Sequence, residues 1–312
     1  MWALASLGPL AILSLFLGAV PVGLTDFFHD PESQRLLLIS RLPRTLAAML
    51  AGGALAVTGQ IMQILTRNRF VEPMTAGAGQ SAALGILIAS FLFPAAAIWV
   101  KMGIAAFTTL LGSAGLLLIL RPLPPTQPLL VPLVALVYGG LISALVTFVA
   151  FQSDMLQFIG TWLNGELSGV LAGRYELLWI AGLAAGATWF IADRITVLSL
   201  GEDTARGLGV NVKAVTALGL VAVSVTTAMV VVTVGAIPFV GLIVPNLVAR
   251  RMGDNLRQAI PVAALSGAVL VLVADILARV LRAPYEIPVS TLVGVAGAGI
   301  FLFLLYTGPR RG

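Results

Sequence analysis

The sequence predicts an all-α integral membrane protein with about ten transmembrane helices. Of its 312 residues, 59% are hydrophobic and only 10% are charged, whereas soluble domains carry about 25% charged residues. The mean hydropathy is +1.04. One span needs about 20 apolar residues, and such segments account for nearly the whole chain. We therefore expect one transmembrane domain, residues 1–312, without a sizeable soluble domain.

The predicted spans follow one another with short connections. In chain order they cover residues 3–24, 42–65, 75–93, 96–120, 129–151, 175–195, 213–233, 236–252, 259–281 and 290–308. Residues Met1–Leu24 lack a positively charged beginning and a convincing cleavage site. We interpret them as a retained first helix and not as a removed signal peptide.

The net charge of +5 is explained by loop residues that set orientation, and it does not indicate nucleic-acid binding. Lys and Arg are enriched in cytoplasmic loops of membrane proteins. With both termini inside, eleven basic residues lie on the inner side and seven on the outer side. The sequence therefore favours cytoplasmic termini, and the reverse orientation stays open.

One apolar segment contains an unusual number of helix breakers. Gly235–Arg251 reads GAIPFVGLIVPNLVARR. Broken helices at membrane depth are tolerated only where protein or a water-filled cavity covers the freed backbone groups. This pattern favours a transport path over a simple anchor, and its candidate pathway and gating residues are Gly235, Pro238, Gly241, Pro245 and Asn246.

The most polar inner loop, residues 199–212, predicts a short helix over Gly201–Val212. Glu202 and Asp203 would lie in its first turn, where negative charge suits the helix dipole. Ala205 and Leu208 are three residues apart and would form a small apolar face. Gly209 is suited to end the helix in a left-handed conformation. Such a helix could dock on a cytoplasmic partner, and a plain connector is an equal alternative.

Charged residues near the outer ends of two spans admit two interpretations each. Arg41 and Arg44 flank Pro43 and could pair with carboxylates of an external partner or anchor the helix by snorkelling. Asp275 and Arg279 are four residues apart on one helix face. A structural ion pair is favoured there over a proton relay.

No pattern predicts covalent chemistry. The chain has no cysteine, and its single histidine, His29, cannot form a histidine cluster. No GxxxxGK[ST] phosphate-binding loop occurs. We therefore expect no enzymatic activity, no catalytic residue and no bound metal or cofactor in this chain.

Three segments in order, Arg41–Gly85, Gly201–Val212 and Gly235–Tyr306, resemble the permease family of bacterial ABC importers for iron–siderophores, haem and vitamin B12, the FecCD/BtuC-like family. The resemblance implies the type II ABC importer permease fold in the bacterial inner membrane. It also implies two cytoplasmic ATPase subunits that bind ATP and Mg, a second permease subunit and an external substrate-binding protein. The family's coupling helix corresponds to Gly201, Glu202, Asp203, Ala205, Arg206, Leu208 and Gly209. Its docking arginines correspond to Arg41, Arg44 and Arg279.

Two departures from the family pattern bear on the substrate. Pro245-Asn246 stands where many members have Pro-His, and Arg67-Asn68-Arg69 stands where many have Arg-Asn-Pro. The Pro-Asn form resembles the branch for catecholate-type siderophores, which often pairs two different permeases. We predict a permease subunit that moves a ferric siderophore inward, with haem or cobalamin as alternatives. An ion-coupled secondary transporter driven through Asp275 and a purely structural membrane protein are the other classes considered.

Overall fold

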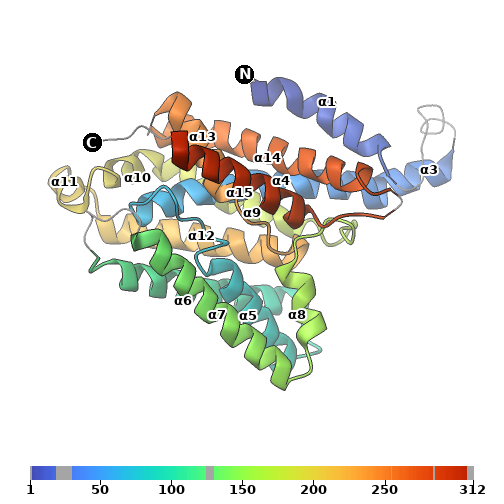
Figure 1. The fold of residues 1–312 in the computed structure, drawn as a ribbon, viewed down its shortest axis with the longest axis horizontal. Helices are drawn as coiled ribbons and strands as arrows, with labels where there is room; N and C mark the ends of the chain where they lie inside the picture. Colours follow the sequence, from blue (N-terminus) through green and yellow to red (C-terminus); the bar gives the residue numbers. More distant parts are fainter. Residues whose placement is uncertain (1, 19–29, 124–129, 254, 284, 308–312) are drawn as a thin grey trace.

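Apolar segments of the length that crosses a bilayer fold into helices throughout the part of the chain that the structure describes. The computed structural model describes residues 2–18, 30–123, 130–253, 255–283 and 285–307 (Figure 1), and no strand occurs in these ranges. His29, Arg310, Arg311 and the end of the first predicted span lie outside them. The helices are α1 (Trp2–Phe16), α3 (Pro31–Leu36), the π-helical η1 (Leu37–Arg41), α4 (Leu42–Leu65), α5 (Ala78–Leu92), α6 (Ile98–Leu120), α7 (Leu130–Gln152), α8 (Leu156–Leu163), α9 (Leu177–Ala187), the 3₁₀ helix η2 (Thr188–Ile191), α10 (Ala192–Leu198), α11 (Glu202–Gly207), α12 (Val212–Val234), α13 (Val240–Met252), α14 (Leu256–Val280) and α15 (Val289–Thr307).

Each predicted span has a helical counterpart, and α4 matches its predicted bounds at both ends. Among the described residues, six helical segments are long and apolar enough to cross a membrane, and α1, α5 and α15 are shorter apolar helices. The span predicted over 236–252 is helical only from Val240, so α13 has 13 residues. It is about 20 Å long at 1.5 Å per residue, against a hydrocarbon core of about 30 Å. The breakers before it therefore shorten the helix.

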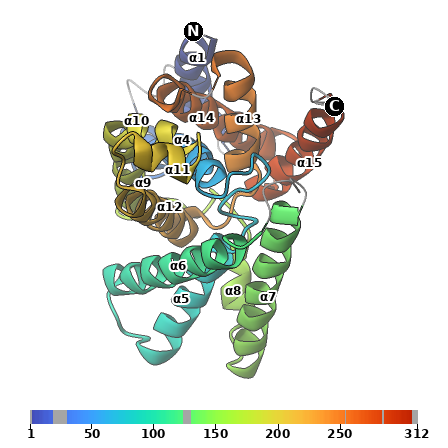
Figure 2. The same cartoon turned by 90° about the vertical axis from the view of Figure 1, so that its left-hand side faces the viewer.

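Helix α4 forms the centre of the bundle, with α14, α12, α9 and α13 around it (Figure 2). Its buried surface is rich in Ala and Gly, and small residues let helix backbones approach closely in a membrane. A Cβ on Gly52 would come within 2.2 Å of the Gly267 carbonyl oxygen on α14. A Cβ on Gly59 would come within 2.1 Å of the Gly241 carbonyl oxygen at the start of α13. The two glycine pairs set how α13 and α14 cross α4.

The remaining helices form a second layer on one side of the bundle. Helices α5 and α6 pack as a hairpin against α12, and α7 and α8 lie outside them (Figure 1). The Tyr138 hydroxyl on α7 donates to the Gly112 carbonyl on α6 at 2.8 Å. Large apolar side chains such as Leu118 and Leu141 point outward from α6 and α7 and are exposed. Such exposed apolar faces suit lipid or another membrane-spanning subunit.

The two ends of the bundle carry different short helices. Helices α10 and α11 lie at one end and α3 lies at the other (Figure 1). Under the predicted orientation the α11 end faces the cytoplasm and the α3 end faces outward. Helix α3 begins at Asp30, whose side chain accepts hydrogen bonds from the amides of Glu32 and Ser33. The Ser33 hydroxyl, followed by these amides, lowers the pKa of Asp30 below its usual value.

Candidate functional site

A buried ionic cluster joins α4, α14 and the segment before α15 at the α3 end. Arg44 Nε and Nη2 donate to Asp275 Oδ1 at 2.9 and 2.8 Å. Arg279 Nη2 donates to the other oxygen of the same carboxylate, and Arg44 Nη1 donates to Glu286 Oε1 at 3.0 Å. Asp275 is fully buried, and Arg44 and Arg279 are each 8% exposed. The Asp275 carboxylate is thus held between two guanidinium groups.

The same end of the bundle binds the last turn of α1. Arg279 Nη1 donates to the carbonyl oxygens of Ser14 and Leu17 at 2.9 and 2.8 Å. Arg41 Nη1 donates to the carbonyl oxygens of Leu15 and Phe16 at 2.9 and 3.1 Å. Carbonyls in the last turn of a helix have no partner within the helix and carry partial negative charge. Arg279 of α14 and Arg41 of η1 donate to these carbonyls and bring positive charge to them, and they thereby fasten α1 to α14 and to the start of α4.

The ion pair predicted between Asp275 and Arg279 is confirmed. Glu286, in the segment before α15, also forms an ion pair with Arg44. Snorkelling is wrong for Arg41 and Arg44, because both side chains are buried and bind groups of this chain. Docking of an external protein by Arg41, Arg44 and Arg279 stays a prediction. It would require these internal bonds to be exchanged for bonds to the partner.

Protein covers the break between α12 and α13. Helix α12 ends at Gly235, which has a φ of +80°, and a Cβ there would come within 2.6 Å of the Asn164 carbonyl oxygen. The Ala236 amide donates to the Trp162 carbonyl at the end of α8 at 3.1 Å. The backbone of residues 162–166 therefore supplies partners for the unwound residues, as expected of irregular backbone at membrane depth.

A buried carboxylate caps the broken helix. Glu72, in the connection between α4 and α5, is fully buried, and its Oε1 accepts from the Phe239 amide at 2.7 Å. The amides of Gly241 and Leu242 also lie against this carboxylate. Negative charge is favourable at a helix N-terminus. Phe239 has a left-handed φ of +67°, which is unusual for a bulky residue, and this conformation aims its amide at Glu72.

The five predicted pathway residues lie along this capped break and the following helix. Gly235, Gly241 and Pro245 are buried, and Pro238 and Asn246 are partly buried. The Asn246 side-chain amide donates to the carbonyl of Arg69 at 2.8 Å and to that of Leu242 at 2.7 Å. Pro245 also lines a pocket between α4, α10 and α14. The pathway and gating role of the five residues stays a prediction.

The predicted short helix at the opposite end is present as α11. Gly201 precedes it with a φ of +110°, and Gly209 follows it with a φ of +79°. Arg206 in its last turn donates to Glu202 in its first turn at 3.1 Å. Leu208 is 64% exposed, whereas Ala205 is fully buried. The apolar face expected from Ala205 and Leu208 is therefore wrong, because Ala205 packs into this chain and only Leu208 is presented outward.

Sequence reasoning missed two residues, Arg67 and Glu72, which link the end of α4 to α11 and the α4–α5 connection to α13. Arg67, just after α4, has a φ of +51° and forms an ion pair of 3.2 Å with Glu202. No local pattern could have indicated a pair so far apart in sequence. Glu72 did carry a signal, because an acidic residue among apolar neighbours needs a partner. Within the described residues, no three His, Cys, Asp or Glu side chains cluster as a metal site.

Comparisons with known proteins agree with this architecture. The FecCD transport family matches residues 6–307. The chain is 40% identical over 297 residues to the petrobactin import system permease protein YclN of Bacillus subtilis, covering 95% of this chain and 94% of that protein. It is 38% identical to the ferric-anguibactin transport system permease protein FatD of Vibrio anguillarum, covering 96% of each. A solved metal-chelate type ABC transporter in an inward-facing conformation is similar with a TM-score of 0.81 and 28% identity over 97% of each chain.

Proposed function

Because this chain belongs to the FecCD transport family, we propose that it is the membrane-spanning permease subunit of an ATP-driven ABC importer that moves a ferric siderophore inward. The family match over residues 6–307 carries this proposal. Similar proteins are named as petrobactin, anguibactin and hydroxamate permeases, which supports the siderophore class. The catecholate type stays a prediction from the Pro245-Asn246 pattern.

In this proposal, partner subunits hydrolyse the ATP that drives transport. The sequence contains no phosphate-binding loop, so ATP and Mg are held by two cytoplasmic ATPase subunits. A second permease, either a paralogue or another copy of this chain, completes the membrane-spanning part. An external binding protein delivers the substrate to the α3 end, and the complex resides in the bacterial inner membrane.

The coupling segment in this proposal is α11 with its exposed Leu208. Residues 208–211 connect α11 directly to α12, and α12 runs without interruption to the break at Gly235. A displacement of α11 by the ATPases is therefore transmitted along one helix to the break. The Glu72 cap holds the other side of the break to the α4–α5 connection, so α13 moves together with that connection. ATP shifts access between the two sides only through differential affinity for the two states.

The buried cluster argues against the ion-coupled alternative. A proton-driven carrier working through Asp275 would neutralise this carboxylate in each cycle. Neutralisation would leave Arg44 and Arg279 facing each other without the charge that now separates them, and an uncompensated buried charge is strongly unfavourable. Asp275 therefore suits a structural role better than a proton relay.

A reconstitution experiment tests the proposed function. The permease complex with its ATPases and binding protein is placed in liposomes, and uptake of a ⁵⁵Fe-loaded siderophore is measured with ATP and with a proton ionophore. We expect uptake to require ATP and to persist with the ionophore. Uptake that stops with the ionophore while ATP remains would contradict the ABC assignment.

A variant pair tests the coupling role of α11. Leu208→Asp places a charge on the outward apolar side chain, so we expect uptake to fall at least tenfold while ATP hydrolysis continues. Leu281→Asp is the matched control, because Leu281 is 60% exposed and lies at the opposite end of the bundle. Normal uptake by Leu208→Asp would refute the coupling assignment, whatever its ATPase activity.

A further inference from the structure

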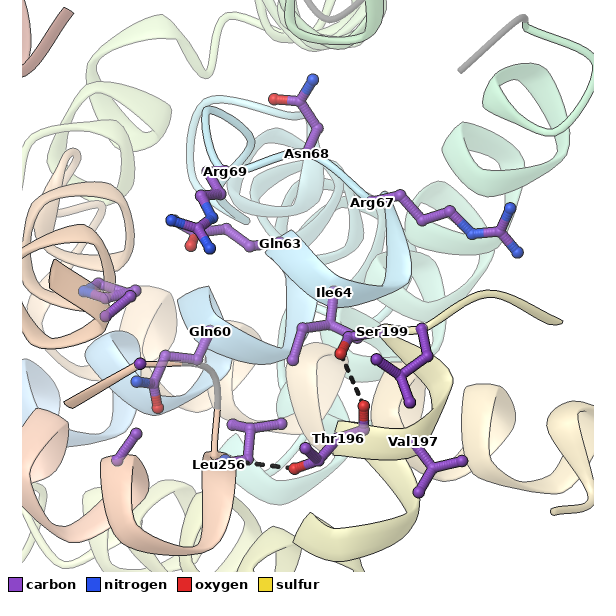
Figure 3. A pocket seen from close by; sticks show the side chains of 15 residues that line it. Gln60, Gln63, Ile64, Arg67, Asn68, Arg69, Thr196, Val197, Ser199 and Leu256 are labelled. Atoms are coloured by element: carbon purple, nitrogen blue, oxygen red, sulfur yellow. Dashed lines mark hydrogen bonds between the residues drawn. The ribbon is translucent and has the colours of Figure 1, made fainter. Parts of the chain in front are cut away.

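A pocket of about 410 Å³ with polar, basic and apolar side chains in its lining lies between α4, α10, α13 and α14, toward the α11 end of the bundle (Figure 3). Gln60 and Gln63 from α4 line it, and Thr196 of α10 and Ser199, just after α10, lie across from them. Pro245 and Ala249 of α13 also line it. The first turn of α14, at Leu256, forms another part of the wall. Its amide is fixed by the Thr196 hydroxyl oxygen at 3.2 Å. Four helices thus build a defined wall.

The charge of the wall and rim is basic. Arg67 and Arg69 line the pocket, and none of the described residues that line it is acidic. In sequence, the segments that form the pocket and its rim carry seven arginines (Arg67, Arg69, Arg194, Arg206, Arg250, Arg251 and Arg257) against four acidic residues (Asp193, Glu202, Asp203 and Asp254). Arg67, Arg206 and Arg257 form ion pairs with Glu202, Asp203 or Asp193, and the arginines remain in excess. Guanidinium groups bind carboxylate and phosphate oxygens through paired N–H donors. An anionic ligand therefore suits the pocket.

Gln60 supplies an independent indication of a ligand. This side chain is 7% exposed, and its Oε1 has no hydrogen-bond partner among the described residues. A buried amide oxygen without a partner is costly, and most such groups have one. Protein covers this oxygen, so a ligand donor reaches it once the Gln60 side chain turns toward the pocket. A ligand with a hydroxyl beside its anionic group would then satisfy it.

The apolar part of the wall indicates where such a ligand comes from. Ile64, Val197 and Leu200 line the pocket together with the polar groups. Basic pockets between transmembrane helices on the cytoplasmic side bind anionic lipid headgroups. A phosphate that carries a glycerol hydroxyl matches both the arginines and the Gln60 oxygen, and the first carbons of its acyl chains match the apolar side chains.

We propose that this pocket binds a glycerol phosphate group, supplied by phosphatidylglycerol of the inner leaflet. The choice of leaflet rests on the proposed orientation of the permease. The binding itself requires neither ATP nor transport. Because the pocket adjoins the Arg67–Glu202 ion pair, a bound lipid would steady the end of α4 next to the coupling segment.

Native mass spectrometry of the purified chain in an uncharged detergent tests the proposal. Phosphatidylglycerol is titrated in, with phosphatidylcholine as the zwitterionic comparison. We expect a single tight phosphatidylglycerol adduct on the unaltered chain and at least tenfold weaker binding to Gln60→Leu and to Arg69→Gln. Arg121→Gln is the matched control, because it removes an exposed arginine that does not line the pocket. The thermal midpoint of each variant without lipid verifies that it folds.

If a variant does not fold, the comparison of the two lipids on the unaltered chain still tests the proposal. Equal binding of the two lipids, or equal binding to Gln60→Leu, Arg69→Gln and the control, would overturn it. Soluble glycerol 3-phosphate is titrated in a parallel arm. Displacement of the lipid at millimolar concentration supports a phosphate site that a lipid normally fills. Binding of glycerol 3-phosphate as tight as that of the lipid would retain the phosphate chemistry and overturn the lipid source.

Discussion

Replacing Asp275 by Asn should destabilise the protein strongly, because one carboxylate holds two buried arginines. The Asn side chain keeps the shape but loses the charge, and its NH₂ group would face guanidinium donors. Removing one partner of a buried ion pair costs about 3–5 kcal/mol. Arg44 keeps Glu286 and Arg279 keeps the carbonyls of α1. We therefore expect the lower end of that range, about 3 kcal/mol.

This cost translates into a measurable shift of the thermal midpoint. Unfolding entropy of about 2.1 cal/mol/K per residue over 312 residues is roughly 0.65 kcal/mol/K. A loss of about 3 kcal/mol then lowers Tm by about 5 °C. Intrinsic fluorescence of the purified protein in detergent during a temperature ramp measures the shift.

Two further variants make this prediction decisive. Asp203→Asn removes a carboxylate of the same kind from a fully exposed side chain, so its shift should be under about 1 °C. The double variant Asp275→Leu with Arg279→Met removes the charge together with one guanidinium, so it should recover part of the loss. An Asp275→Asn shift no larger than that of Asp203→Asn would show that the cluster is solvated and would refute the reasoning.

Three other outcomes follow from the contacts of α4 and α13. Glu72→Ala should lower ATP-driven uptake more than Glu72→Gln, because Gln retains an acceptor for the cap; equal uptake by both variants would contradict the capping role. Gly59→Ala should reduce the yield of monodisperse protein in size-exclusion chromatography, because its Cβ has no room, whereas Gly140→Ala, with nothing within 4 Å, should not. Exchanging Arg67 and Glu202 should restore coupling that either single charge reversal weakens, and ATPase-to-uptake ratios measure it. If the pair has no role, the exchanged variant would not recover the ATPase-to-uptake ratio of the unaltered protein.

The sequence alone was sufficient for the helices and the family. Hydrophobic length predicts a helix for each span, and the predicted bounds of α4 agree to the residue because a long, largely apolar run follows Arg44. The i, i+4 spacing of Asp275 and Arg279 predicted their pairing, because neighbours on a helix face meet whatever the tertiary structure. Gly209 was assigned to the end of α11 for a similar local reason.

Local sequence patterns could not predict the hydrogen-bond and ion-pair partners that come from distant parts of the chain. Arg44 lies 231 residues from Asp275, so only the crossing of α4 and α14 could show that the arginine binds this chain. The inward orientation of Ala205 could not be read from its spacing to Leu208, because a six-residue helix can rotate either side toward the bundle. The sequence thus determined a helical membrane protein, its family and its breaks, which depend on local composition. The tertiary structure decided the cap by Glu72, the ionic cluster and the pocket between α4, α10, α13 and α14, because each joins groups that only helix packing brings together.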